Sequence, residues 1–261
     1  MNLREHFKQL PLEQTKLTKE EKIELNNKDL VVKHNALINA TSDYSFCKNE
    51  LRIICKLISD INNTYEKDFE KKVIRITDLD FNEAENFTNN YTYLVDLCKG
   101  LQKKTFFMNG SYYSWFTKLT PLSGVGIVEY EFHNDLKPFL LDLKTNFTKY
   151  HLTNILKLRS SYSIQIFELL YQYKTIKQRK ITFEELRKIL NIPDSYRNVD
   201  IRRMLEGVQK DLSKNTTITF DFTFEKLGKQ FNSIIFNISK NTNNTNIIDI
   251  NEDSTATKPK A

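Results

Sequence analysis

The chain has 261 residues, enough for one large domain or two smaller ones with buried cores. Hydrophobic residues make up 39% of it, which excludes a disordered chain, and its 6 Gly and 5 Pro argue against a loop-rich β-sandwich or a Gly-rich cofactor fold. The net charge of +6 suggests an anionic partner, and no apolar run is long enough to predict a membrane span or a membrane partner.

The first block of predicted elements follows a polar N-terminal extension at residues 1–33. Apolar residues at helical spacing, from Leu51 to Ile61, predict its first helix, and Asn109-Gly110 predicts a β-hairpin. We expect the aromatic residues Tyr112, Tyr113 and Trp115 of that hairpin to pack in a core or an interface. In chain order, the block should contain a helix at 44–62, a strand at 73–76, a helix after Asp78, a helix at 89–103, and strands at 105–108, 112–119 and 125–132.

The second block repeats this order of elements. A helix is expected at 161–174, and Thr182-x-x-Glu185 fits a capping box that begins a short helix ending near Leu190. A turn at 191–194 leads to a longer helix at 198–213. From Thr217 to Phe224 the residues alternate, with Thr217 outward and the phenylalanines inward, which predicts a strand. A turn at 225–230 then leads to a return strand containing Ile234, Phe236 and Ile238.

Helix, short helix, turn, helix and β-hairpin is the order of a winged helix, which is a helix-turn-helix with an added hairpin. Two such blocks predict an α+β protein with two tandem winged-helix domains. We place the N-terminal extension at 1–33, the first domain at 34–143, the second at 144–240, and a disordered tail at 241–261.

The basic surplus lies in the second predicted domain. Residues 144–240 contain 18 Lys and Arg against 9 Asp and Glu, whereas residues 1–143 contain 19 against 21. A module that binds a polyanion explains this split better than an enzyme surface of even charge.

The helix at 198–213 is the strongest candidate for reading DNA. Its apolar residues form one narrow stripe, and Arg203, Glu206 and Lys210 point the opposite way. The second helix of a helix-turn-helix lies in the major groove, where Arg can donate two hydrogen bonds to guanine. Arg197, just before the helix, and Arg203 are therefore the first choices for base contacts. A solvated face, with Glu206 paired to Arg203 and Lys210, explains the same pattern.

Two further segments are candidates for DNA contact. Lys226 and Lys229 at the hairpin tip suit phosphates or the minor groove, although lysines that protect a sheet edge explain them equally well. The polar side chains of the helix at 89–103 are either an auxiliary DNA contact or an ordinary solvated face. The DNA-binding residues expected in the second domain are Arg197, Asn198, Asp200, Arg202, Arg203, Glu206, Lys210, Lys226 and Lys229; those in the first are Asn89, Asn90, Thr92, Lys99, Gln102 and Lys103.

Patterns of catalytic and metal-binding residues are missing from the sequence. The 4 histidines are isolated and form no His-x-His, which a metal-dependent nicking nuclease requires, and no phosphate-binding loop of an ATPase occurs. The 3 cysteines are too few and too irregular for disulfides or zinc, and Cys55 and Cys98 fit core positions. We expect a cytoplasmic protein that is not an enzyme and has no cofactor and no metal.

Three motifs in the second half resemble the iteron-plasmid replication initiators. Weaker similarity extends back to about residue 34, so that the resemblance covers roughly 200 residues. The motifs are Phe147-Thr148-Lys149-Tyr150 with Leu158-Arg159-Ser160-Ser161-Tyr162-Ser163-Ile164-x-x-Phe167-Glu168-Leu169-Leu170-x-x-Tyr173; Phe183-x-x-Leu186-Arg187-x-x-Leu190; and Tyr196-Arg197-x-x-Asp200-Ile201-Arg202-Arg203, followed by a helix and a hairpin.

The resemblance implies two winged-helix domains that bind double-stranded DNA at directly repeated plasmid origin sites, the iterons. It implies base contacts by the arginine before the recognition helix and one in its first turn, which are Arg197 and Arg203 here. It also implies a monomer that opens the origin and a homodimer, formed through the first domain, that represses the initiator's own gene and so controls plasmid copy number. The host replication initiator, helicase and chaperones are the implied partners. The hairpin tip has fewer cations than the family pattern.

Three hypotheses follow from these observations. The first is a sequence-specific initiator of plasmid replication that is not an enzyme. The second is a winged-helix transcriptional repressor, for example of its own gene, without an initiation role, because a fold does not determine a function. The third is a protein–protein module that binds no DNA, which the basic second half argues against.

Overall fold

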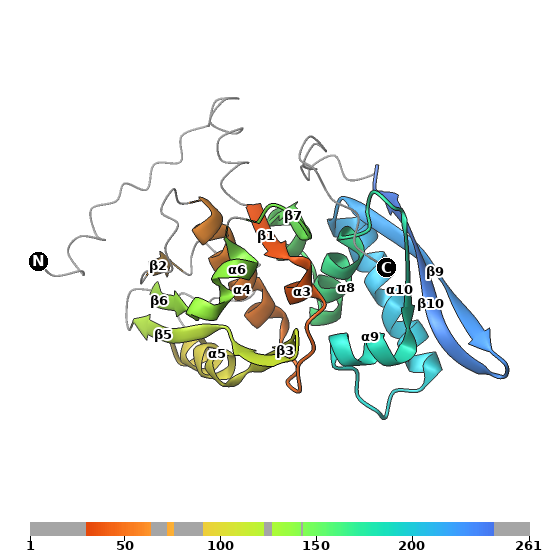
Figure 1. The fold of residues 1–261 in the computed structure, drawn as a ribbon, viewed down its shortest axis with the longest axis horizontal. Coiled ribbons are helices and arrows are strands. Elements are labelled where there is room, and N and C mark those ends of the chain that lie inside the picture. Colours follow the sequence, from red (N-terminus) through yellow and green to blue (C-terminus); the bar gives the residue numbers. More distant parts are fainter. Residues whose placement is uncertain (1–29, 64–71, 76–90, 123–126, 142, 243–261) are drawn as a thin grey trace, which may run out of the picture.

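The computed structural model describes residues 30–63, 72–75, 91–122, 127–141 and 143–242 (Figure 1). The predicted helix after Asp78, most of the N-terminal extension and most of the tail lie outside these residues. The first half of the described chain contains β1 (Leu30–His34), α3 (Asn35–Ile38), α4 (Lys48–Asn63), β2 (Lys72–Arg75), α5 (Tyr91–Lys103), β3 (Thr105–Met108), β4 (Ser111–Ser114), β5 (Phe116–Leu122), β6 (Ile127–Phe132), a short 3-10 helix (Asn134–Leu136) and α6 (Lys137–Leu140).

Helices α4 and α5 confirm the first and third helices predicted for this half. The hairpin β3–β4 turns at Asn109 and Gly110, whose φ values of 52° and 81° are both in the left-handed region that the Asn-Gly pair favours. The single strand predicted at 112–119 is wrong, because the chain leaves β3 after Ser114 and joins β6 from Phe116 onward. The consecutive residues Trp115 and Phe116 are both buried there, which breaks the alternation of a single strand.

The second half contains β7 (Phe147–His151), α7 (Thr153–Leu156), α8 (Ser161–Tyr171), β8 (Gln178–Thr182), α9 (Phe183–Leu190), α10 (Asn198–Asn215), β9 (Ile218–Leu227) and β10 (Gln230–Lys240). Its sheet has the order β8-β10-β9, and β9 and β10 form the wing. The predicted turn at 225–230 is too long, because Leu227 still pairs with Gln230 and only Gly228 and Lys229 lie between them. The wing is therefore longer than expected.

The packing of α10 follows its sequence pattern. The four apolar residues of its stripe are at most 3% exposed, and α10 packs against β9 and α8. Phe220 is buried as predicted, while Phe222 and Phe224 are half-buried nearer the end of the wing. Thr217 was expected outward but is buried, because the side-chain Oδ1 of Asn154 accepts hydrogen bonds from its N–H (2.9 Å) and its hydroxyl (3.1 Å).

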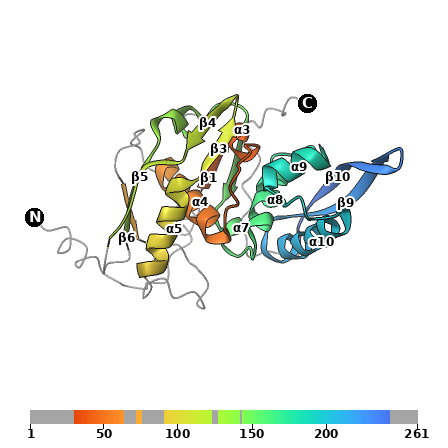
Figure 2. The same ribbon diagram turned by 90° about the horizontal axis from the view of Figure 1, so that it is seen from below.

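The two halves are joined by a ribbon and a helix. β1 pairs antiparallel with β7, from Leu30 opposite His151 to His34 opposite Phe147, and α8 contacts both α4 and α10. Figure 2 shows α5 and α10 in opposite halves of the molecule, with α4, α7 and α8 between them. The division into domains at residue 144 stays a prediction, because these contacts connect the segments on both sides of it.

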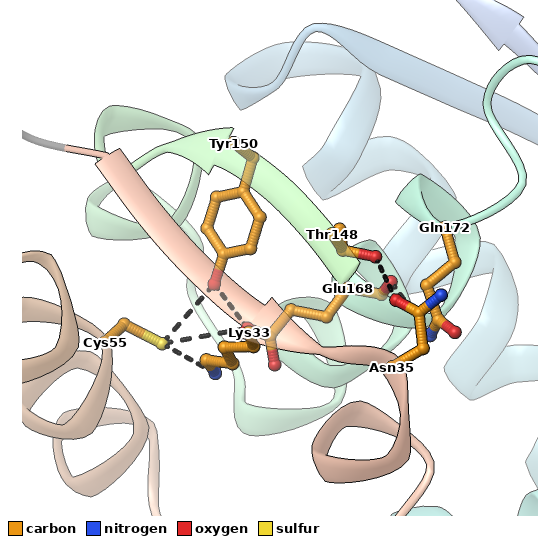
Figure 3. Close-up of polar contacts among 7 residues, drawn as sticks. All are labelled: Lys33, Asn35, Cys55, Thr148, Tyr150, Glu168 and Gln172. Atoms are coloured by element: carbon orange, nitrogen blue, oxygen red, sulfur yellow. Dashed lines mark hydrogen bonds and ion pairs between the residues drawn. The ribbon is translucent and has the colours of Figure 1, made fainter. Parts of the chain in front are cut away.

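A buried polar cluster lies where β1, β7, α4 and α8 meet (Figure 3). The Lys33 ammonium lies 2.6 Å from Glu168 Oε1 and 3.3 Å from Cys55 Sγ, and the Tyr150 hydroxyl donates to the same carboxylate. Burial acts to lower the pKa of Lys33, yet Cys55 and Glu168 raise it on balance, so the ammonium stays charged. Burial raises the pKa of Cys55 to about 11, which makes it an unreactive core thiol, as predicted.

Candidate nucleic-acid interface

The turn between α9 and α10 is built from specific capping contacts. The Thr182 hydroxyl accepts the backbone N–H of Glu185 (3.1 Å), so the predicted start of α9 is confirmed. Asn191 ends α9 in the left-handed conformation, at φ 48°. The Arg187 guanidinium then donates to the carbonyl oxygens of Pro193 (3.0 Å) and Tyr196. These contacts determine the angle at which α10 leaves the turn, and the structural role of Arg187 was not part of the sequence-based prediction.

Arg197 and Arg203, the two predicted base-reading residues, meet at one carboxylate. Asp200 Oδ2 accepts the backbone N–H of Arg197 (2.9 Å) and lies 3.5 Å from its Nε, while Asp200 Oδ1 lies 4.0 Å from Arg203 Nη1. The side chains of Arg197 and Arg203 are 80% and 74% exposed. The first turn of α10 therefore presents two guanidinium groups to solvent, held by a carboxylate between them.

Asp200 has a structural task at this position. The backbone N–H of Arg197 holds the pKa of Asp200 below its ordinary value, and the guanidinium groups of Arg197 and Arg203 lower it further. The carboxylate is therefore ionised at neutral pH and caps the helix. Asp200, which was predicted to bind DNA directly, is thus placed to position the two arginines.

The rest of the exposed face of α10 carries Asn198, Glu206 and Lys210. Within the part of the chain that the structure describes, no ion pair joins Glu206 to Arg203 or Lys210, so the alternative of a salt-bridged surface lacks the pairs it requires. A fourth exposed residue, Arg202, lies against the wing, with its guanidinium carbon 4.5 Å from the centre of the Phe224 ring.

Recognition helix and wing are connected by Gln209. Its side-chain amide donates to the Phe220 carbonyl oxygen (2.7 Å) and to Asp221 Oδ1 (2.8 Å). Together with the contact of Arg202, these bonds connect α10 to β9. The sequence pattern of this helix gave no indication of these bonds.

The predicted lysines of the wing lie near its tip. Lys226 and Lys229 are exposed, and the Lys226 ammonium lies 5.0 Å from the centre of the Phe231 ring. Closer to the base of the wing, Glu225 accepts from Ser233 (2.7 Å) and pairs with Lys180 (2.6 Å). The charge of Glu225 is thus balanced by Lys180, and the exposed lysines Lys226 and Lys229 lie near the end of the hairpin.

The residues predicted to contact DNA in the first half are spread along one helix, α5, and the segment before it. Asn89 and Asn90 lie outside the described residues, whereas Thr92, Lys99, Gln102 and Lys103 are exposed on α5. The Gln102 amide donates to the Phe116 carbonyl oxygen (3.1 Å), which connects α5 to β5. These residues are separated from α10 by the helices between the two halves (Figure 2). The structure does not bring the two groups of candidates together.

The aromatic residues of the β3–β4 hairpin divide between the core and the surface. Trp115 is 8% exposed and packs on Phe106, with ring centres 4.7 Å apart. Tyr112 is 69% exposed and lies against Phe107. The expectation of core packing thus holds for Trp115, and Tyr112 is left on the surface.

Among residues 30–63, 72–75, 91–122, 127–141 and 143–242, no group of three or more His, Cys, Asp and Glu side chains could hold a metal ion. Across the same ranges, no helix has both the length and the apolar character that a membrane crossing needs.

Comparisons with known proteins agree with this fold. The crystal structure of Pi initiator protein in complex with iteron DNA is similar in fold, with a TM-score of 0.59 and 18% sequence identity over 82% of this chain and 98% of that chain. An uncharacterised 27.6 kDa protein of Escherichia coli is 27% identical over 124 residues, which are 46% of this chain. The chain matches 52% of the length of that protein.

Two family models match consecutive parts of the chain. The model of the WH1 domain of initiator replication proteins matches residues 30–171, and the model of their WH2 domain matches residues 182–238. The first match alone covers more than half of the chain, and the second contains α9, α10 and nearly all of the wing. The protein therefore belongs to the family of initiator replication proteins, with two winged-helix domains in tandem.

Proposed function

We propose that this protein initiates plasmid replication by binding directly repeated origin sites, the iterons, with α10 in the major groove of each repeat. The observation that carries the proposal is the exposed arginine pair at the start of α10. N-terminal residues of a recognition helix meet base edges, and Arg donates two parallel hydrogen bonds to guanine. The similar fold of Pi initiator protein, whose structure contains iteron DNA, supports the same DNA class.

The charge distribution supports this assignment. Residues 144–240 carry 18 basic against 9 acidic side chains, and the wing ends in lysines that suit phosphate contacts. Binding should weaken steeply with salt, because each phosphate contact releases condensed counterions. In this proposal WH2 is the main DNA-reading domain, and WH1 contributes an auxiliary contact through the exposed side chains of α5.

We also propose the oligomeric states and the host partners that the family resemblance implies. A homodimer formed through WH1 represses the initiator's own gene, and the monomer opens the origin and recruits the host initiator, helicase and chaperones. The protein performs no catalysis of its own in this scheme. Analytical ultracentrifugation with and without DNA tests the first part: a dimer that dissociates on repeated sites agrees with it, and a monomer at all concentrations contradicts it.

The test of DNA binding is a footprint of the purified protein on DNA flanking its own gene. Protection that repeats about every two helical turns, roughly 21 base pairs, supports iteron binding. Protection of one symmetric site favours a repressor without an initiation role. No protection by a folded protein contradicts both and leaves the protein-interaction module.

Two variants test the role of α10. Arg203→Ala should weaken target binding by about 1–3 kcal/mol and relax the preference at one base pair. Arg159→Ala is the matched control: this exposed arginine lies beside Asp211, about 16 Å along α10 from Asp200 at 1.5 Å per residue. If Arg203→Ala keeps the ratio of target to scrambled DNA binding, α10 is not the reading element.

A further inference from the structure

The tip of the wing carries an apolar side chain that is not packed in the core. Leu227 is 75% exposed, the most exposed large hydrophobic residue of the described chain. It is the last residue of β9 and pairs with Gln230 across the two-residue turn, where Gly228 takes a positive φ of 63°. Both views show this end of the hairpin projecting beyond α9 and α10, at the side of the molecule away from the first half (Figures 1 and 2).

Alternation along β9 explains why Leu227 has no packing role. Phe220, Phe222 and Phe224 face α10 and the core, and Lys226 continues this face against the ring of Phe231. Leu227 therefore lies on the opposite side of the strand. Removing its side chain should leave the core intact, so the residue can be tested without unfolding the protein.

The surroundings of Leu227 suit a polyanion. Lys226 and Lys229 flank it, Gln230 is exposed opposite it, and Glu225 is engaged by Lys180 and Ser233. Such a tip is drawn to the phosphates that line a groove, and Leu227 is the exposed apolar side chain that it carries there. The minor groove, about 6 Å wide, admits a thin hairpin tip, and other proteins insert leucine there.

We propose that Leu227 enters the minor groove beside the bases that α10 reads and imposes a preference for A·T pairs at that position. This inference rests on the proposed function. The floor of the groove at an A·T pair carries only acceptors, whereas a G·C pair adds the guanine N2 amino group. An apolar side chain in contact with the floor excludes that amino group and leaves its hydrogen bond unmade.

The test uses the full chain and its footprinted target, with base pairs beside the α10 contact changed one at a time. Each A·T pair is replaced by G·C and, separately, by inosine·C. Inosine lacks the N2 amino group, so inosine·C keeps the major groove of G·C and has the minor groove of A·T. At the pair below the wing, the wild type should lose at least about fivefold in affinity with G·C, as for one unfavourable base pair, and regain it with inosine·C.

Leu227→Ala should bind all three duplexes with similar affinity and bind the A·T duplex more weakly than the wild type. Ile176→Ala, which removes another exposed apolar side chain (42% exposed) in the connection between α8 and β8, should behave as the wild type does. Circular dichroism confirms that both variants are folded.

Three results would overturn the inference. The first is a G·C penalty that persists unchanged in Leu227→Ala, and the second is inosine·C bound as weakly as G·C by the wild type, which would indicate reading in the major groove. The third is a wild type that is insensitive to every flanking pair, as expected if Leu227 contacts another protein. In all three the wild type still prefers its target over scrambled DNA; if that preference is also absent, the proposed function itself fails.

Discussion

Replacing Lys33 with Met should destabilise the protein by about 3–5 kcal/mol, because it leaves the Glu168 carboxylate buried without its cation. The two side chains are 6% and 8% exposed and lie 2.6 Å apart, between β1 and α8. Lys180 and Glu225 form an ion pair of the same length, 2.6 Å, but their side chains are 59% and 38% exposed. Lys180→Met should therefore cost less than about 1 kcal/mol.

The comparison isolates burial, since the two pairs share chemistry and distance. Urea unfolding at neutral pH, followed by circular dichroism, gives the free energy of unfolding of each variant. A third protein, Lys33→Met with Glu168→Gln, should be less destabilised than Lys33→Met alone, because glutamine still accepts from Tyr150 and carries no charge. The reasoning is refuted if Lys33→Met costs no more than Lys180→Met, or if the double variant is no more stable than the single one.

Three smaller predictions concern the helix-turn-helix and the wing. The pKa of Asp200, measured by carboxyl NMR, should lie below that of an ordinary aspartate even in Arg197→Ala, because the first cause of the shift is a backbone N–H that alanine retains. Capping by Asp200 then stabilises the fold above the ordinary pKa of an aspartate, and this stabilisation is lost as the pH falls through the lowered pKa of the folded state. An ordinary pKa in the variant would contradict this. Gln209→Ala should lower the free energy of unfolding, measured with urea, by about 1–2 kcal/mol, since two acceptors lose their donor. It should also speed amide hydrogen exchange in β9. Unchanged exchange would mean that α10 and the wing are not coupled through this side chain. Thr182→Ala should cost about 0.5–2 kcal/mol of stability, and Thr182→Ser, which keeps the hydroxyl, should cost less.

Much of the fold could be predicted because it depends on local patterns. The stripe of α10 from Ile201 to Leu212 repeats at helical spacing, and the hairpin at Asn109-Gly110 follows from two residues that favour positive φ. Each pattern lies within one element, so no knowledge of a distant partner is needed. The prediction of a single strand at 112–119 was wrong because it spans the junction of two sheets. The consecutive buried residues Trp115 and Phe116 connect them there.

The connections between the halves could not be predicted, because their partners are far apart in the sequence. β1 was placed in the N-terminal extension, yet Lys33 pairs with Glu168 across 135 positions and β1 hydrogen-bonds with β7. A buried lysine is expected only where a carboxylate meets it, and one sequence does not show which carboxylate does. The apolar residues from Leu30 to Val32 fit a strand, but nothing in the sequence shows that this strand pairs with β7.

The site shows the same division between local and distant information. Arg197 and Arg203 were identified correctly as exposed residues at the start of α10, because helix geometry alone decides which face they occupy. What supports the other end of α10 comes from elsewhere in the chain. Arg52 of α4 donates to the Leu158 carbonyl oxygen (2.8 Å), and the next backbone N–H, of Arg159, donates to Asp211 of α10 (2.8 Å).

These two bonds form a continuous path from a helix of WH1 to the recognition helix of WH2. Arg52 is 1% exposed, so its guanidinium is fixed by the packing around α4, and the Leu158–Arg159 peptide connects it to Asp211. A change in the packing of α4 should therefore shift the Arg159 N–H that donates to Asp211, and through α10 the two arginines at the opposite end of this helix. The position of Arg197 and Arg203, the proposed reading residues, is thus linked to WH1 through Asp211 at the opposite end of α10.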